Sequence, residues 1–324
     1  MSVTSALIRS TDSTIAPSDH YNGADLSPEH QATPRRAALL MVLAALLFAA
    51  MAASVKAASS GLPNAVIVFG RCAFGVAALL PWLAVRPGLS LRTRRFGGHA
   101  LRAATGLGAM ACYFYAIGRL RVADASLLNF SLPLFIPVVA RFGLGETFPR
   151  RVWRILGMGF CGLILILKPS PGLFQPAAAV GLAAGLLGAV AQVTVRGLTS
   201  TESSTRIVFW FGVLSTLLAA GPAAATWRSP SPALWLALAA SGLFATVGQL
   251  FMTAAYAAAP AAQVGPFLYS TVVFAGVFDW AFWGQLPDAW SLGGALIVAL
   301  AGALALRWMS PALVRPPVPP GRGP

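Results

Sequence analysis

Charged side chains are scarce in this chain of 324 residues: they make up 10% of it, against about 25% in soluble domains. Hydrophobic residues make up 57%, and the 23 Lys and Arg against 9 Asp and Glu give a net charge of +14. On a soluble protein this balance would suggest a nucleic-acid partner. The chain lacks the solvated surface that such binding needs, so we expect no nucleic acid.

Cysteine and histidine are also rare, with three of each. Neither residue type shows the spacing of a metal site, and an odd number of cysteines in apolar stretches does not suggest a disulfide framework. No GxxxxGK[ST] phosphate loop occurs, and no cluster of acids and histidines suggests an enzyme acting at the membrane. We therefore expect no cofactor, no metal and no catalytic residues. The cysteines are Cys72, Cys112 and Cys161.

Long apolar runs fill the rest of the chain. A helix needs about 20 mainly apolar residues to cross a bilayer, and the sequence predicts an all-α integral membrane protein with ten such helices. Polar residues 1–34 and Pro-rich residues 309–324 are predicted to be disordered cytoplasmic tails. The ten stretches are Ala37–Val55, Ala65–Val85, Leu101–Ile117, Ala123–Val139, Val152–Leu167, Ala177–Val195, Ile207–Ala225, Ala233–Tyr256, Ala261–Trp283 and Leu292–Trp308.

Cations and tryptophans indicate the orientation of these helices. With the N-terminus inside, most of the 23 Lys and Arg fall in the cytoplasmic connections, as the positive-inside rule requires. All nine tryptophans lie near predicted span ends, where indole rings prefer the headgroup zone. Ten spans with both termini in the cytoplasm satisfy both patterns.

The two halves of the chain resemble each other at an offset of about 140 residues. We infer a duplication, with repeats at 36–168 and 176–308. Five helices is an odd number, so the second repeat must be inverted relative to the first, as in secondary transporters that work by alternating access. The matches are SVKAASS at Ser54–Ser60 with TVRGLTS at Thr194–Ser200, IVF at Ile67–Phe69 with Ile207–Phe209, and GLGETFP at Gly143–Pro149 with FWGQLPD at Phe282–Asp288.

These features resemble the EamA-type branch of the drug/metabolite transporter superfamily. The resemblance covers residues 36–308 and includes the runs Tyr113–Phe135 and Ala254–Pro266, Gly145-Glu146, and Gly284-Gln285, where the family more usually has Gly-Glu. It implies a multi-pass protein of the bacterial inner membrane, coupled to exchange or an ion gradient. It leaves the cargo open among amino acids and their derivatives, polyamines, flavins, S-adenosylmethionine, opine-type metallophores and drugs.

Polar residues within the spans are the candidate substrate ligands, because such side chains are costly in lipid and face the bundle interior. The clearest stripe runs along one face of the eighth span. Interhelical hydrogen bonding is the alternative role for these residues, and two prolines, Pro133 and Pro137, predict a bend in the fourth span. The candidate substrate-binding residues are Tyr113, Asn129, Thr246, Gln249, Thr253, Tyr256, Tyr269 and Ser270.

Three charged residues in the outer third of the spans are candidates for gating or proton coupling: Lys56, Arg71 and Asp279. A lone buried charge is expensive, so we expect Lys56 or Arg71 to pair with Asp279. A static structural pair is the alternative. We expect Glu146 to form a solvated ion pair with nearby arginines.

The sequence favours a secondary transporter that exports a small polar or amphipathic metabolite, such as an amino-acid derivative or an opine-type metallophore. The alternative is an uptake permease for a vitamin or nucleoside-like compound such as riboflavin or S-adenosylmethionine. An integral membrane enzyme or a non-transporting receptor is a more distant alternative. The expected partners are a small-molecule substrate and the lipid bilayer, and the protein is expected to be a monomer or homodimer.

Overall fold

The computed structural model describes residues 34–85, 90–117, 119–120, 122–146 and 148–308, and this part of the chain contains helices but no strand. The predicted tails lie outside it, except for Pro34 at the start of the first helix. The helices are α2 (Pro34–Ala58), α3 (Asn64–Ala84), α4 (Phe96–Ile117), α5 (Val122–Asn129), α6 (Leu132–Leu144), α7 (Arg150–Leu167), η2 (Pro171–Phe174), α8 (Pro176–Leu198), α9 (Ser204–Ala225), α10 (Pro232–Ala258), α11 (Ala261–Val264), η3 (Gly265–Tyr269), α12 (Ser270–Trp283) and α13 (Ala289–Trp308).

Eight helical stretches in the described chain are long and apolar enough to cross a membrane. The other two predicted spans form the helices α4 and α7, which are 22 and 18 residues long but do not meet that composition. Helix α7 begins with Arg150 and Arg151 and also contains Arg154, while α4 contains His99 and Arg102. The protein is therefore an all-helical, multi-pass membrane protein, with fewer clear spans than the ten predicted.

The fourth and ninth predicted spans are both broken. The fourth divides into α5 and α6 at Phe130 and Ser131, and the ninth divides into α11, η3 and α12. Proline explains the break, because Pro133 has no N–H to donate to the carbonyl of Asn129. Pro266 lies within η3 in the other half. The bend expected from the prolines is present, but it lies just before Pro133, and Pro137 remains inside α6.

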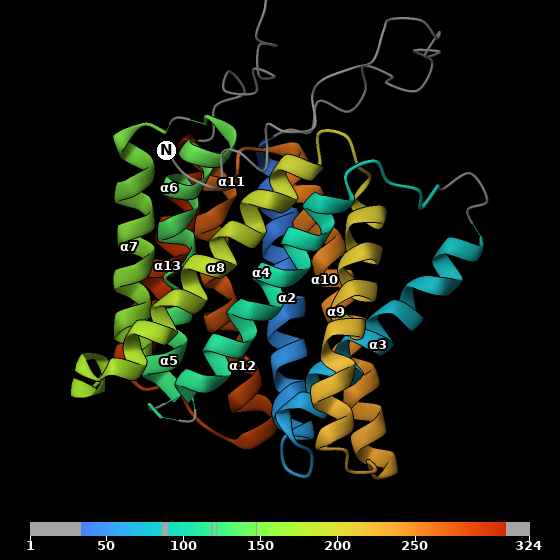
Figure 1. Ribbon diagram of the computed structural model, residues 1–324. Coiled ribbons are helices and arrows are strands. Elements are labelled where there is room, and N and C mark those ends of the chain that lie inside the picture. Colours follow the sequence, from blue (N-terminus) through green and yellow to red (C-terminus); the bar gives the residue numbers. More distant parts are fainter. Residues whose placement is uncertain (1–33, 86–89, 118, 121, 147, 309–324) are drawn as a thin grey trace, which may run out of the picture.

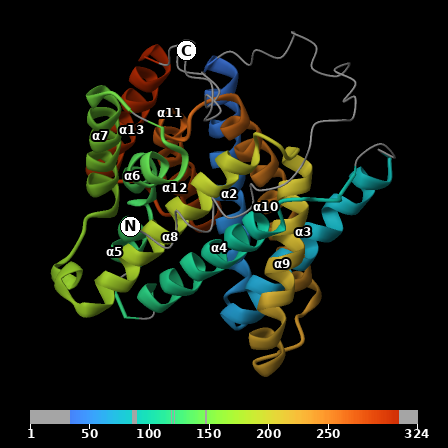
Figure 2. The same ribbon diagram turned by 45° about the horizontal axis from the view of Figure 1, so that its top comes forward.

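Helices that correspond in the two halves make corresponding contacts. Helix α2 packs against α10 and α12, while its counterpart α8 packs against α4 and the segments α5 and α6. Figures 1 and 2 show α7 beside α13 at one end of the bundle, with α3 and α9 together at the other. Each of these two terminal pairs joins the same helix of both halves.

The turns after α6 and α12 also match. Gly145 and Gly284 both adopt the left-handed conformation, with φ of 68° and 66°. The following N–H groups close the same type of helix cap, Glu146 to Ala140 and Gln285 to Asp279. Glycine is favoured at both positions because a side chain would be strained at this φ.

Candidate functional site

The polar stripe of α10 faces the protein interior. Thr246, Thr253 and Tyr256 are buried, and Gln249 is half-buried. Thr253 Oγ1 and Tyr256 Oη have no hydrogen-bond partner among the described residues. Gly242 lets α10 cross α3 closely, because a Cβ at this position would lie 2.6 Å from the Cβ of Phe74.

A pocket lies where α3, α9 and α10 meet, beside this stripe. It is a narrow recess with a free volume of about 30 Å³ in this conformation, room for one or two waters, so a larger ligand requires it to widen. Three predicted site residues line it: Arg71, Thr246 and Gln249. Its other lining residues are Cys72, Gly75, Val76, Leu79, Val208, Phe211, Gly212 and Ala245.

Arg102 reaches the same place from α4. Its Nη2 donates a 2.9 Å hydrogen bond to Gln249 Oε1, and its guanidinium lies over the ring of Phe211, 4.4 Å from the centroid. The residue is only 3% exposed. Arg102 is not among the predicted site residues, because it lies at the cytoplasmic start of the predicted span Leu101–Ile117, next to the cations of the preceding connection. The signal was its position inside the apolar run LRAATGLGAM.

The remaining predicted substrate residues do not line this pocket. Tyr113 bonds to Ser126 at 2.9 Å, which joins α4 to α5. Tyr269 is fully buried against α7, where a Cβ on Gly159 would meet its ring. Asn129 and Ser270 lie at the two helix breaks, and neither belongs to the pocket.

Lys56 and Arg71 were the two expected partners of Asp279, and in the structure Asp279 pairs with Lys56. Lys56 Nζ lies 2.6 Å from Asp279 Oδ1 and also 4.1 Å from the centre of the Trp283 ring. The pair joins the end of α2 to α12. The expected alternative pairing of Arg71 with Asp279 is wrong, because Arg71 Nη1 lies 3.3 Å from Met51 Sδ and forms no ion pair with a described residue.

A second ion pair between the two halves uses the cation equivalent to Lys56, although its acid, Glu146, matches Gln285 rather than Asp279 in the repeat. Arg196, which matches Lys56 in the repeat, lies near the end of α8 and contacts Glu146 just after α6, with Nε to Oε1 at 3.2 Å. Arg196 Nη1 also donates to the carbonyl of Tyr256 at 2.6 Å. The expected pairing of Glu146 with nearby arginines is therefore wrong. The sequence signal was the match of SVKAASS with TVRGLTS.

The connection between α8 and α9 is held by a buried carboxylate. Glu202 accepts hydrogen bonds from Thr93 at 2.7 Å and Arg206 at 2.6 Å. Burial alone would raise the pKa of Glu202, but these hydrogen bonds and the Arg206 charge outweigh it and leave the pKa below its ordinary value. The carboxylate therefore links this connection to residue 93, just before α4.

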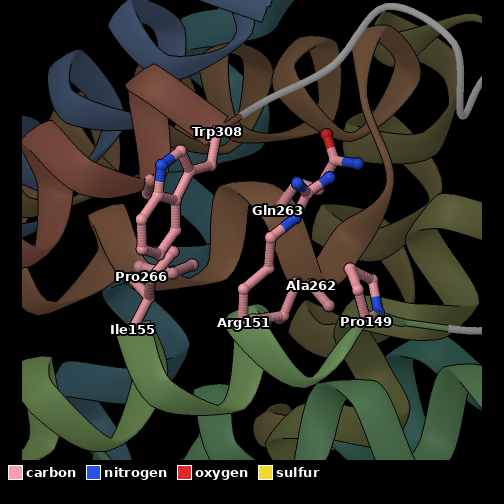
Figure 3. A pocket seen from close by; sticks show the side chains of 9 residues that line it. Pro149, Arg151, Ile155, Ala262, Gln263, Pro266 and Trp308 are labelled. Carbon is pink, nitrogen blue, oxygen red and sulfur yellow. The ribbon is translucent and has the colours of Figure 1, made fainter.

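Another small pocket, with a free volume of about 20 Å³, lies between α7, α11 and α13 (Figure 3). Arg151 and Gln263 stand on one side of it and Trp308 on the other. None of the predicted site residues lines it. Within the described part of the chain, no three His, Cys, Asp or Glu residues come together as a possible metal site.

The helical bundle, with apolar helices long enough to cross a membrane, is that of a multi-pass membrane protein. The family comparison is specific: the EamA-like transporter family matches residues 35–168 and again 175–307, and the chain belongs to this family. The superfamily resemblance is thereby confirmed, and the family is one of transporters rather than enzymes.

Individual relatives differ in what their names say they carry. The pseudopaline exporter CntI of Pseudomonas aeruginosa strain PAO1 is 35% identical over 81% of this chain and 93% of its own. The riboflavin transporter of Rhizobium johnstonii is 32% identical, over 83% and 90%, and the S-adenosylmethionine uptake transporter of Rickettsia prowazekii is 26% identical, over 72% and 79%. A solved crystal structure matches with a TM-score of 0.73 and 20% identity over 85% and 99%, which shows the fold alone.

Proposed function

We propose that this protein exports a small polar or amphipathic metabolite across the bacterial inner membrane by alternating access. The cargo class is an amino acid or amino-acid derivative, opine-type metallophores included. Export rather than uptake is supported by the similarity to the CntI exporter. This similarity has a higher sequence identity and covers more of both chains than the similarity to the S-adenosylmethionine uptake transporter. Uptake of riboflavin or S-adenosylmethionine is the second candidate, favoured by the riboflavin transporter at 32% identity.

The substrate path in this proposal follows the interior face of α10. Thr246, Gln249, Thr253 and Tyr256 supply neutral polar groups, two of which have buried oxygens without a described partner. Buried polar groups normally find a partner, and a passing solute supplies one here. Tyr113, Asn129, Tyr269 and Ser270 remain predicted contributors near the two helix breaks.

The proposed topology has ten spanning helices in two inverted repeats, 36–168 and 176–308, with both termini in the cytoplasm. Three observations support it: the twofold match of the family, the corresponding helix contacts, and the matched left-handed glycines. Helices α4 and α7 complete the ten. Their arginines lie towards the cytoplasmic ends under this orientation, where cations are favoured. A monomer or homodimer is the expected assembly.

The two ion pairs, whose cations Lys56 and Arg196 match in the repeat, are proposed as the gates. Lys56–Asp279 closes the outer end between α2 and α12, and Arg196–Glu146 closes the inner end between α8 and the turn after α6. Inversion of the repeats brings the equivalent cations Lys56 and Arg196 to opposite faces of the membrane. Alternating access then consists of opening one pair while the other stays closed.

Metabolite profiling of deletion and overexpressing strains, inside cells and in the medium, tests the function. An exporter's cargo accumulates inside the deletion strain and is depleted from its medium, and overexpression reverses both changes. The opposite redistribution would support uptake. If no small molecule is redistributed in either strain, the transport proposal is wrong.

A further inference from the structure

The pocket between α3, α9 and α10 is bordered by two positive charges and no negative one. Arg71 lines it directly, and Arg102 contacts two of its walls, Gln249 and Phe211. Arg71 and Tyr256 both lie within electrostatic range of the Arg102 guanidinium. Two cations placed together in a largely apolar site repel each other and lose hydration, so an uncompensated arrangement is unfavourable.

No acid in the described chain is available to neutralise them. Its five carboxylates are all engaged elsewhere: Asp279 with Lys56, Asp288 with Lys168, Glu146 with Arg196, Glu202 with Arg206, and Asp124 with Ser170. The other four acids of the sequence lie in the first 33 residues, outside the described part.

The guanidinium groups also have free donor capacity. An arginine carries five N–H donors, yet the bond to Gln249 is the one hydrogen bond that Arg102 makes among described residues, and its buried Nε has none. The Nε of Arg71 is likewise buried without a described partner. Planar guanidinium groups are well suited to binding carboxylates through paired hydrogen bonds.

We propose that Arg71 and Arg102 bind a carboxylate group of the transported solute. The pocket has a free volume of only about 30 Å³ in this conformation, so it must widen as the protein opens. The rest of the solute then packs against Phe211 and the aliphatic residues Val76, Leu79 and Val208, which line the same pocket. The solute is therefore an organic anion with an apolar portion. This inference rests on the proposed transport function, and it favours a carboxylated metabolite over an uncharged vitamin.

The test measures ligand-induced thermal stabilisation of the purified full-length protein in lipid nanodiscs. Acetate, succinate, glutamate and citrate are each compared with the corresponding amide, and with chloride and phosphate, at equal ionic strength. Because a ligand that binds the folded state raises Tm by mass action, at least one carboxylate should raise Tm above its amide. Equal stabilisation by phosphate or chloride would indicate a nonspecific anion site and would overturn the proposal, as would no difference between carboxylates and amides.

Three variants tie the effect to this pocket. Arg102→Gln should abolish the carboxylate-dependent shift, whereas Arg154→Gln, which removes an exposed arginine near the start of α7, should retain it. Gln249→Glu is the sharper variant, because it supplies an internal carboxylate to Arg102 at the position of the 2.9 Å bond. This variant should fold at least as well as the wild type yet lose the response, and an unchanged response in Gln249→Glu and Arg102→Gln would refute the assignment.

Two further comparisons show whether the bound anion is a free solute or a lipid headgroup, and whether a failure concerns the binding site or the transport function. Replacing neutral lipid in the nanodisc with phosphatidylglycerol should leave the carboxylate shift in place; if the lipid alone abolishes it, the arginines bind a lipid headgroup and the proposal fails. The binding assay does not depend on metabolite profiling. Binding without any redistributed metabolite would reject the transport function, whereas export of an uncharged compound would reject only the carboxylate site.

Discussion

Removing the negative charge of Asp279 should loosen the outer end of the protein by a small and calculable amount. Both side chains of the Lys56–Asp279 pair are more than a third exposed, at 42% and 39%. Exposed ion pairs contribute about 0.2–1 kcal/mol after solvent screening. Since about 1.36 kcal/mol corresponds to a factor of ten, Asp279→Asn should increase the outward-open population by a factor of about 1.4–5.

Cys72 provides a way to measure that population without knowing the cargo. It is buried and lines the pocket between α3, α9 and α10, beside Arg71. In a Cys112→Ser, Cys161→Ser background it is the remaining thiol, and its labelling by an impermeant maleimide added outside reports outward opening. Asp279→Asn should accelerate labelling within the calculated range, and the exchanged pair Lys56→Asp with Asp279→Lys should return it towards the wild-type rate.

The Lys168–Asp288 pair is the matched control. Its side chains are similarly exposed, at 46% and 48%, but it joins the end of α7 to the segment before α13. Lys168→Gln should therefore leave Cys72 labelling unchanged. Equal acceleration in both variants would show a general loosening and refute the gate, and so would no acceleration in Asp279→Asn.

Three further predictions concern stability, each read as the Tm of purified protein. Gly242→Ala should destabilise by about 1–3 kcal/mol through overpacking because its Cβ would lie 2.7 Å from the backbone N of Gly75, whereas Gly221→Ala, which meets nothing within 4 Å, should not destabilise. Gly145→Ala should cost about 1–2 kcal/mol through its left-handed backbone, and an effect below 0.5 kcal/mol would contradict this. The pKa of Glu202 is lowered in the folded protein, so its ionised carboxylate stabilises the fold at pH values above the ordinary glutamate pKa of about 4.3. This stabilisation is lost as the pH falls through the lowered pKa of the folded state. The Tm gap between wild type and Glu202→Gln should therefore be constant at neutral pH and close in acid, and a gap that widens in acid would contradict the sign.

Local patterns made much of the architecture predictable. The 3.6-residue period places Thr246, Thr253 and Tyr256 on one interior face of α10, because a helix fixes which residues share a face. Proline chemistry predicts the break in the fourth span, although not its exact residue. The sequence match at an offset near 140 anticipates the two equivalent glycine caps, Gly145 and Gly284.

Long-range geometry accounts for what the sequence could not provide. Arg102 was not predicted as a site residue, because an arginine at a span end has the same sequence signature whether it faces the cytoplasm or the interior. Its contact with Gln249 shows that it faces the interior. Tyr269 points to α7 because Gly159 leaves room for its ring there, a choice that no local pattern encodes. The partner of Glu146 lies 50 residues away in Arg196, so proximity in sequence suggested the wrong arginines.

The inner pair should respond with the opposite sign and a larger magnitude. Arg196 and Glu146 are only 19% and 20% exposed, and a hydrogen bond to a charged group contributes about 1.5–3 kcal/mol when shielded. Glu146→Gln keeps the shape of the side chain and removes the charge, so we take the lower end, which is about a tenfold change in population. Because this variant favours the inward-open state, outside labelling of Cys72 should slow, by at most about that factor, while Asp279→Asn accelerates it. If both pairs had only a static structural role, both variants would change the Cys72 labelling rate in the same direction. Faster labelling in Glu146→Gln would therefore reject the proposal that the two pairs are gates, even if Asp279→Asn behaved as expected.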